Sequence, residues 1–253
     1  MGEIELNTHF KIIIPLYNVE KWVRACIRSI KRQDYENYQC IIIDDMSTDD
    51  SAKIIREELE GCENFIFVKN EVKKYALRNI YEAIELSNPS EEDVIVTVDG
   101  DDWLANNEVL KKLNGVYKKE KCLLTYGSYA EYPSGKKGKF SREIPASIEK
   151  ERSYRKNQWS ASHLRTFKYD LWKRIKKEDL LDSDNNFYEM AWDLAFMFPM
   201  LEMSGNKNKY IDDILYVYNV SNPINDHKVN HRKQLYSESL IRNKEPYNLI
   251  GEE

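Results

Sequence analysis

The sequence predicts a layered α/β domain with a largely parallel central sheet. Over the first hundred residues, short β-rich runs alternate with stretches of helical period, which is the pattern of such a domain. Polar residues follow these runs where the strands should end. The chain has 253 residues, of which 42% are hydrophobic, enough to bury a sizeable core. We therefore expect one domain over residues 1–253.

Four apolar runs are the expected strands of the first half. They cover residues 10–16, 41–43, 65–68 and 94–98. Apolar residues at helical spacing predict the connecting helices, which cover residues 22–30, 54–59 and 76–84. Asn18 is a candidate cap of the first helix, and Asn88-Pro89 is expected to end the third.

The second half has weaker patterns. It predicts a helix at residues 109–117, a largely buried helix through residues 198–203, and strands at 123–129 and 214–218. A basic run, for which a solvated loop is favoured over an anion-binding arm, consists of Lys136, Lys137, Lys139, Arg142, Lys150, Arg152, Arg155 and Lys156. The charged tail from Asn230 is expected either to pack as an arm or to be loosely ordered.

Charge, cysteines and hydropathy exclude several classes of protein. A net charge of -5 argues against a general nucleic-acid binder. The four cysteines are scattered without zinc or disulfide spacing, which favours a reducing compartment. The sequence has no leader pattern and no apolar run of about 18 residues. We therefore expect a soluble, cytoplasmic protein without a transmembrane segment, and peripheral membrane contact and oligomerisation stay open.

Three carboxylates around one glycine follow the strand at 94–98, in the segment Asp99-Gly100-Asp101-Asp102. Carboxylates this close repel one another unless a cation compensates them. Mn²⁺ and Mg²⁺ take oxygen ligands and often complete their shell with water and substrate phosphates. We expect Asp99 and Asp101 to flank such an ion, with Asp101 or Asp102 as the direct ligand. The alternative is a turn capped by Asp102 or Asn106 before a helix.

Two other strands end in polar residues. Pro15-Leu16-Tyr17-Asn18 ends the first expected strand, and Asp44-Asp45 ends the second. In open α/β sheets, ligands bind beyond the carboxyl ends of the strands. A carboxylate accepts a hydrogen bond from the imide N–H of uracil, and an aromatic face covers the ring. Packing of Tyr17 in the fold is the alternative interpretation.

Together these segments resemble family 2 glycosyltransferases of the GT-A fold. Residues 12–18, 43–49 and 98–102 carry the resemblance, and Ala76-Leu77-Arg78-Asn79 is similar to the family's Ala-Arg-Asn element. The resemblance covers about the first 105 residues. It implies a Rossmann-like, mixed but mostly parallel central sheet flanked by helices, with a nucleotide-sugar-binding half over 8–105, an acceptor-binding half over 106–228 and a C-terminal arm over 229–253.

The resemblance also implies an activity. This is the metal-dependent, inverting transfer of a hexose-type sugar from a UDP-sugar to a hydroxyl of a glycan, lipid or protein-linked acceptor, as in polysaccharide biosynthesis. No Gln-x-x-Arg-Trp element of processive polymerases occurs, so addition of a single sugar is favoured. The residues expected at the nucleotide sugar are Pro15, Tyr17, Asn18, Glu20, Asp44, Asp45, Arg78, Asp99, His163 and Arg165.

His163 and Arg165 lie on one side of the segment 159–167 if it is extended. They would then both face phosphate or acceptor, and the alternative is a structural histidine with a surface arginine. The resemblance implies a histidine that completes the metal shell, for which His227, or Asp226 beside it, is the candidate. A plain turn is the alternative there.

Inverting transfer needs a base that takes the proton of the acceptor hydroxyl. Members of the family generally carry an adjacent Glu-Asp pair before a helix, whereas here Glu189 and Asp193 are separated. Four residues apart, the two would share one helical face. Asp193 is the first candidate base and Glu189 the second, and the alternative is a first-turn acid favoured by the helix dipole.

Two rival functions stay open. A sugar nucleotidyltransferase would usually carry a Gly-rich phosphate loop near the first strand, and residues 10–25 contain no glycine. A non-catalytic nucleotide- or glycan-binding relative would explain the separated acids as the loss of a base. An Asp193→Ala variant that loses turnover but binds nucleotide would favour the transferase.

Overall fold

The computed structural model describes residues 7–223 and 230–251. Within these residues, eight strands form one sheet in the order β3-β2-β1-β4-β7-β6-β8-β5. Their bounds are β1 Phe10–Leu16, β2 Tyr38–Asp44, β3 Phe65–Lys69, β4 Val94–Thr97, β5 Trp103–Leu104, β6 Leu124–Tyr132, β7 Arg165–Lys168 and β8 Asn208–Asn219. β1 pairs in parallel with β2 and β4, β2 with β3 and β6 with β8, whereas β7 is antiparallel to β4 and β6. The prediction of a mixed, mostly parallel sheet is confirmed.

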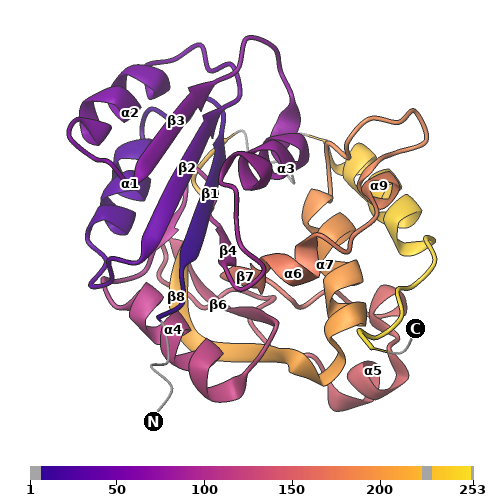
Figure 1. Cartoon of the computed structure of the whole chain (residues 1–253). Helices are drawn as coiled ribbons and strands as arrows, with labels where there is room; N and C mark the ends of the chain where they lie inside the picture. The colour runs from indigo at the N-terminus through magenta and orange to yellow at the C-terminus, as the bar shows by residue number, and fades with distance from the viewer. Residues whose placement is uncertain (1–6, 224–229, 252–253) are drawn as a thin grey trace.

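Helices cover both faces of this sheet (Figure 1). The α-helices are α1 Val23–Lys31, α2 Ser51–Leu59, α3 Tyr75–Leu86, α4 Val109–Glu120, α5 Ala146–Glu151, α6 Tyr169–Trp172, α7 Trp192–Ser204 and α9 His231–Arg242. The described part of the chain also has short 3₁₀ turns at η1 Tyr154–Lys156, η2 Lys177–Leu180 and η3 Gly205–Lys207. None of the helices in residues 7–223 and 230–251 is both long enough and apolar enough to cross a membrane.

Two hydrophobic cores lie on opposite faces of the sheet because successive strand side chains alternate in direction. Ile13 and Ile41 belong to the core that contains α3, α6 and α7, and Ile12, Ile14 and Ile42 to the core that contains α1 and α4. Both sets are fully buried. The apolar runs of the sequence therefore form strands that are covered on both sides, as parallel strands usually are.

Local details differ from the sequence-based expectations. α1 begins at Val23 with Trp22 as its cap. Asn18 instead has a φ of 51°, and its side-chain oxygen accepts from the backbone N–H of Thr48 at 2.9 Å. β8 covers residues 208–219 rather than 214–218, because its pairing with β6 continues along its whole length. Pairing between distant strands is not visible in local sequence pattern.

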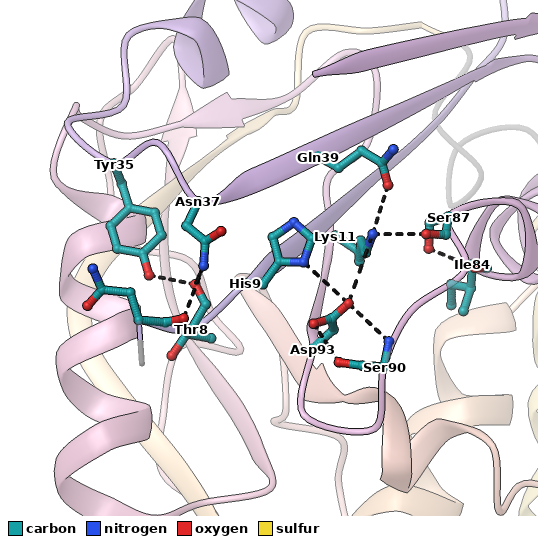
Figure 2. Close-up of polar contacts among 11 residues, drawn as sticks. Thr8, His9, Lys11, Tyr35, Asn37, Gln39, Ile84, Ser87, Ser90 and Asp93 are labelled. Atoms are coloured by element: carbon teal, nitrogen blue, oxygen red, sulfur yellow. Dashed lines mark hydrogen bonds and ion pairs between the residues drawn. The ribbon is translucent and has the colours of Figure 1, made fainter. Parts of the chain in front are cut away.

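The amino-terminal end of the sheet is fixed by buried Lys11 (Figure 2). Its Nζ donates to Gln39 Oε1 and to the carbonyl oxygen of Ser87, both at 2.9 Å, and lies 3.9 Å from Asp93 Oδ2. His9 Nδ1 lies 3.3 Å from the same oxygen. Burial lowers the pKa of Lys11, although Asp93 acts in the opposite direction. The cluster joins β1 and β2 to the connection between α3 and β4.

The C-terminal segment packs as an arm around a buried ion pair. Arg155 Nε and Nη2 donate to Glu202 Oε1 and Oε2 at 2.6 and 2.9 Å, and Arg155 Nη1 donates to the carbonyl oxygen of Ile241 at 2.6 Å. The backbone N–H of Tyr247 donates to Glu202 Oε2 at 3.0 Å. The favoured interpretation of the basic run as a solvated loop is thus wrong for Arg155, because Glu202 and α9 enclose this side chain.

Candidate functional site

One cavity of about 980 Å³ lies at the edge of the sheet where β1, β2 and β4 end. Its walls come from both halves of the chain, and α9 closes one side with five residues, His231, Gln234, Leu235, Glu238 and Arg242. Of the residues expected from the sequence, it is lined by Pro15, Tyr17, Asp45, Asp99, Asp101, His163, Arg165, Glu189 and Asp193. Most of the candidate residues therefore share one cavity.

Asp45 is held rigidly at the end of β2. Its Oδ1 accepts from Asn70 Nδ2 at 3.0 Å and from the backbone N–H of Lys74 at 2.8 Å. Its Oδ2 accepts from the backbone N–H of Tyr75 at 2.9 Å. Burial alone would raise the pKa of Asp45, but hydrogen bonds from neighbouring amides outweigh it and the pKa is lowered. Asp45 therefore presents a carboxylate to the cavity.

Asp44 has a different place. It is fully buried, and its Oδ1 accepts from the backbone N–H of Ser47 at 2.7 Å, while its Oδ2 lies 3.9 Å from Lys69 Nζ. It does not line the cavity. Of the two adjacent aspartates that the sequence leaves open, Asp45 is the one at the cavity, and Asp44 holds the turn after β2.

Tyr17 lines the cavity beside Asp45. The Nζ of Lys73 lies 2.8 Å from the centre of the Tyr17 ring and 3.6 Å from Asp45 Oδ2. Lys73 follows β3 and is not among the residues expected from the sequence. The rule that directed attention to the ends of β1, β2 and β4 applies equally to the end of β3, so the signal was present.

Besides Asp44, three residues expected at the nucleotide do not line the cavity. Asn18 accepts from Thr48, and Glu20 Oε2 accepts from the backbone N–H of Asp50 at 3.0 Å. Both join the loop after β1 to the loop after β2. Arg78 lies on α3, where its Nε donates to Glu82 at 2.8 Å. An ion pair within the helix thus takes the guanidinium that was expected near base or phosphate.

The aspartates after β4 point in different directions. Asp99 and Asp101 line the cavity, and Asp101 Oδ2 accepts from Asn222 Nδ2 at 2.7 Å. Asp102 is fully buried, and its two oxygens accept from the Tyr216 hydroxyl and the backbone N–H of Asn219, both at 2.7 Å. Asp102 thus connects this turn to β8. Of the two residues expected as the direct ligand of an ion, Asp101 lines the cavity and Asp102 does not.

Burial and like charge act on this group. Burial raises the pKa of Asp101. Burial, together with the charges of Asp101 and Asp99, raises the pKa of Asp102 well above its usual range. A cluster of negative charges of this kind favours binding of a cation, either alone or together with a phosphate group.

Gly100 is needed for this turn. A Cβ atom at this position would lie 2.3 Å from Leu16 Cβ, and the backbone N–H of Gly100 donates to the carbonyl oxygen of Pro15 at 3.2 Å. Only glycine allows the turn to approach the end of β1 so closely. Close packing against the end of β1 thus explains why a glycine stands between Asp99 and Asp101.

The donor set at the cavity fits a hard cation that takes further ligands from its substrate. Within the described part of the chain, no group of three or more His, Cys, Asp or Glu side chains is placed to hold a metal ion. Asp99 and Asp101 nevertheless match the one or two carboxylates that Mg²⁺ commonly uses beside substrate phosphates. His227 and Asp226, the expected additional ligands, lie outside the described residues.

His163 is buried among aromatic rings beside the cavity. It stacks on Tyr216 with a centroid separation of 4.6 Å and on Tyr218 at 5.5 Å. Its Nδ1 lies 3.4 Å from Arg165 Nη1. Burial, and then the positive charge of Arg165, lowers the pKa of His163 well below its usual value. The histidine is therefore neutral at pH 7 and offers one N–H donor and one acceptor.

Arg165 and Asp193 form the polar pair on the far side of the cavity. Arg165 Nη2 donates to Asp193 Oδ2 at 2.7 Å, and Arg165 is 4% exposed. Asp193 lies in the first turn of α7, after Ala191 with its φ of 51°. His163 and Arg165, the two candidates from segment 159–167, thus both line the cavity, as expected if they lie on one side of the segment.

Glu189 also lines the cavity, but it precedes α7. The expectation that Glu189 and Asp193 share one helical face is wrong, because the left-handed backbone at Ala191 separates Glu189 from the helix. Lys233 of α9 donates to Glu189. The carboxylate of Glu189 is therefore paired with a lysine of the C-terminal arm, whereas the carboxylate of Asp193 is paired with Arg165.

Comparison with known proteins assigns the family. The model of the glycosyl transferase family 2 matches residues 11–177. The chain therefore belongs to glycosyltransferase family 2, a family of enzymes, and its fold is the GT-A fold. α7, β8 and α9 lie beyond the matched residues.

Two bacterial relatives support the assignment. Glycosyltransferase GlyA of Streptococcus pneumoniae is 25% identical over 218 residues, which are 83% of this chain and 30% of GlyA. An uncharacterized glycosyltransferase of Haemophilus influenzae is 34% identical over 121 residues, which are 47% of this chain and 46% of the relative. The chain thus spans less than half the length of either relative.

Two solved structures share the fold. S. aureus TarS 1-349 in complex with UDP-GlcNAc has a TM-score of 0.61 and 20% identity, and the match covers 84% of this chain and 58% of that one. The mannosyltransferase PcManGT of Pyrobaculum calidifontis, in complex with GDP-Man and Mn²⁺, has a TM-score of 0.61 and 15% identity, with 96% and 67% of the chains covered. At these identities the likeness shows the fold alone.

Proposed function

We propose that this protein is an inverting, metal-dependent glycosyltransferase that moves a hexose-type sugar from a UDP-sugar to a hydroxyl acceptor. Addition of a single sugar to a glycan, as in polysaccharide biosynthesis, is the favoured form of the reaction. The nucleotide sugars in the TarS and PcManGT structures are consistent with this class of donor. A specific arrangement of the cavity residues supports the proposal.

The main support for this proposal is the order in which the cavity residues lie across the sheet. Asp45, Tyr17 and Asp99 follow the neighbouring strands β2, β1 and β4. Arg165 pairs with Thr97 at the start of antiparallel β7, so it lies at the same edge. Three strand spacings, or about 14 Å, separate the ends of β2 and β7. A base at Asp45 and a diphosphate at Asp99 would then place the sugar near Arg165.

The residues at the far side provide the proton chemistry. In the proposed reaction Asp193 takes the proton of the acceptor hydroxyl as its oxygen attacks the anomeric carbon opposite the diphosphate. Arg165 holds the carboxylate by a charge-assisted hydrogen bond. Neutral His163 offers a hydrogen bond without adding a positive charge that would compete with Arg165 for Asp193.

Asp99 and Asp101 would hold the metal ion, which when bound neutralises charge that develops on the departing nucleoside diphosphate. The acceptor is proposed to bind on the side formed by α9 and Trp159, since these residues line the cavity from the second half of the chain, whereas Tyr17 and Asp45 belong to the first half. Aromatic faces and amide groups such as Gln158 and Gln234 are suited to sugar rings and hydroxyls.

The test is release of UDP from a panel of UDP-sugars in the presence of Mn²⁺, with GDP-mannose as a second class of donor. Asp101→Asn is compared with Asp184→Asn, an exposed aspartate away from the cavity. We expect the wild type and Asp184→Asn to release UDP from one donor and Asp101→Asn to lose this activity. Wild-type protein that binds no nucleotide in calorimetry would overturn the proposal.

A further inference from the structure

Residues 133–140 form a turn that folds back on the end of β6. Ala130 pairs with Lys137 in an antiparallel bridge. β6 lies two strands from β4, on the side away from β1 and β2, which corresponds to about 10 Å. Lys139 and Phe140 of the turn line the cavity. The turn therefore borders the acceptor end of the proposed site.

Close packing fixes the position of this turn. A Cβ atom at Gly138 would lie 1.9 Å from Tyr129 Cζ, so only glycine lets the turn pack against that ring. The backbone N–H of Gly138 donates to the carbonyl oxygen of Tyr129 at 2.9 Å, and the backbone N–H of Tyr129 donates to Ser141 Oγ at 3.1 Å. Tyr129 contacts His163 edge to face, with ring centroids 5.8 Å apart. The two residues after Gly138 are thus held beside the wall that contains His163.

Lys139 differs from the other cationic side chains of the cavity. In residues 7–223 and 230–251, every other lysine or arginine that lines the cavity is paired with a carboxylate. These pairs are Lys73 with Asp45, Arg165 with Asp193 and Arg242 with Glu238. Lys139 is exposed and forms no ion pair with a carboxylate of the described residues. Its charge is therefore available to a ligand.

Arg142 adds a second charge at the same wall. It is exposed, and its Nη2 donates to Oε1 of Gln158, which lines the cavity. The neutral amide of Gln158 orients the guanidinium without neutralising it, and no carboxylate of the described segments pairs with Arg142. Phe140 lies between the two cations in the sequence and is 39% exposed. An aromatic face with two unpaired cations beside it suits a sugar that carries an acidic group.

We propose that the acceptor of this enzyme carries an acidic group, a phosphate or a carboxylate, which Lys139 and Arg142 bind. The inference rests on the proposed function and names the chemical class of its acceptor. Phe140 packs against the sugar ring that carries the acid, and the hydroxyl to be glycosylated then lies toward Asp193. Lys139 donates a charge-assisted hydrogen bond to the acid, and Arg142 donates from the N–H groups that Gln158 leaves free.

The other charges of this end of the cavity are compatible with an acidic ligand. The carboxylates of Glu189, Asp193 and Glu238 are each paired with a cation, so they repel an acid less than free carboxylates would. Glu131 lines the cavity from β6 and has no ion pair among the residues that the structure describes. Its charge is opposite to that of Lys139, so the two residues should change the affinity for an acid in opposite directions.

The experiment measures the binding of acidic probes and their neutral counterparts by calorimetry, on protein saturated with UDP and Mn²⁺. Tetragalacturonate and its methyl ester test a carboxylate, and maltotetraose with and without a 6-phosphate tests a phosphate. Wild type is compared with Lys139→Met, Lys139→Arg and Glu131→Gln. Lys150→Met is the matched control, because Lys150 is an exposed lysine of α5 that belongs to the same basic run and does not line the cavity.

We expect wild type to bind at least one acidic probe about tenfold or more tightly than its neutral counterpart. Lys139→Met should remove most of this preference, because Met keeps the length of the side chain without its charge. Lys139→Arg should keep the preference, and Glu131→Gln should increase it. Lys150→Met should bind all four probes as wild type does.

Wild type that binds UDP but prefers neither acidic probe to its neutral counterpart would overturn the inference and leave the proposed function in place. A preference that Lys139→Met retains would overturn it as well. A Lys139→Met variant that weakens UDP binding instead of the acidic probes would assign the ammonium to the donor diphosphate, which also contradicts the inference. Wild type that binds no UDP would overturn the proposed function itself.

Discussion

Arg165 Nη2 lies 2.7 Å from Asp193 Oδ2 and thereby joins the first residue of β7 to the first turn of α7. The two residues are 28 positions apart in the sequence, and α7 lies outside the segment that matches the family model. The contact holds the Asp193 carboxylate at the wall of the cavity, to which both halves of the chain contribute. The predictions below concern this contact, the turn at Gly100, the buried histidine and the C-terminal arm.

Arg165→Met is expected to lower kcat about 100-fold, because the proposed base then loses its orientation. UDP binding should change little. Steady-state kinetics of transfer or of donor hydrolysis, with calorimetry of UDP, gives both quantities. The Arg165→Met/Asp193→Asn double variant should lose no more activity than Asp193→Asn alone, since each change disrupts the same Arg165–Asp193 pair.

The exposed pair of Arg174 and Asp170, with Nη2 and Oδ1 3.1 Å apart, supplies the control. Arg174→Met should keep wild-type kcat. If the losses of Arg165→Met and Asp193→Asn were instead to multiply in the double variant, the two residues would act independently and Arg165 would not be the positioning residue of Asp193.

Gly100→Ala is expected to destabilise the protein by about 1–3 kcal/mol, because its Cβ would overlap the end of β1. The same shift displaces Asp99 and Asp101 and should weaken Mn²⁺-dependent UDP binding. Urea unfolding and calorimetry measure the two effects. Gly115→Ala is the matched change, since a Cβ there meets nothing within 4 Å, and in a helix it should stabilise by about 0.5–1 kcal/mol.

The lowered pKa of His163 leads to a prediction of how the free energy of unfolding depends on pH. Its folded-state pKa is depressed by burial and then by Arg165, so below about pH 6.5 the unfolded chain binds more protons than the folded protein. The free energy of unfolding should therefore fall as pH falls through this window, by up to about 1.4 kcal/mol per pH unit. The contribution is fully present above that range.

His163→Phe keeps an aromatic ring between Tyr216 and Tyr218 and cannot titrate. Urea unfolding of both proteins from about pH 7 to about pH 5 should show a smaller loss of stability in the variant. The difference between the two proteins cancels the titration of Asp101 and Asp102, which both contain. Parallel curves would mean that His163 is not buried in its neutral form.

Glu202→Ala is expected to destabilise the protein by about 3–5 kcal/mol, because it leaves the charge of Arg155 buried without a partner. The backbone N–H of Tyr247 loses its acceptor as well. α9 should then detach before the sheet unfolds, which makes the backbone at Arg232, Lys233 and Arg242 accessible to limited trypsin digestion. Urea unfolding and a digestion time course provide the measurements.

The exposed pair of Glu92 and Lys168 is the reference for that experiment. Glu92→Ala should cost no more than about 0.5 kcal/mol, as exposed ion pairs usually do. A Glu202→Ala protein that is as stable and as resistant to trypsin as Glu92→Ala would show that the buried pair does not hold the arm.

The sequence by itself determined the strands and helices of the first half and the edge of the sheet at which the cavity lies. Apolar runs and helical spacing are local properties, and the turn at Asp99-Gly100-Asp101 follows a buried strand whatever surrounds it. The motifs at 12–18, 43–49 and 98–102 were sufficient to identify the family, which the match over residues 11–177 confirms.

Only the tertiary structure decided which of two adjacent aspartates faces the cavity. Neighbouring residues in a turn point in different directions, and contacts with distant segments determine those directions. Asp44 contacts Ser47 and Lys69, and Asp102 is held in the interior by hydrogen bonds from β8. The contact of Lys73 with the Tyr17 ring likewise depends on tertiary packing, although the place of Lys73 after β3 is visible in the sequence. The position of α9 along the cavity depends on packing between segments far apart in the chain, for which local sequence pattern carries no signal.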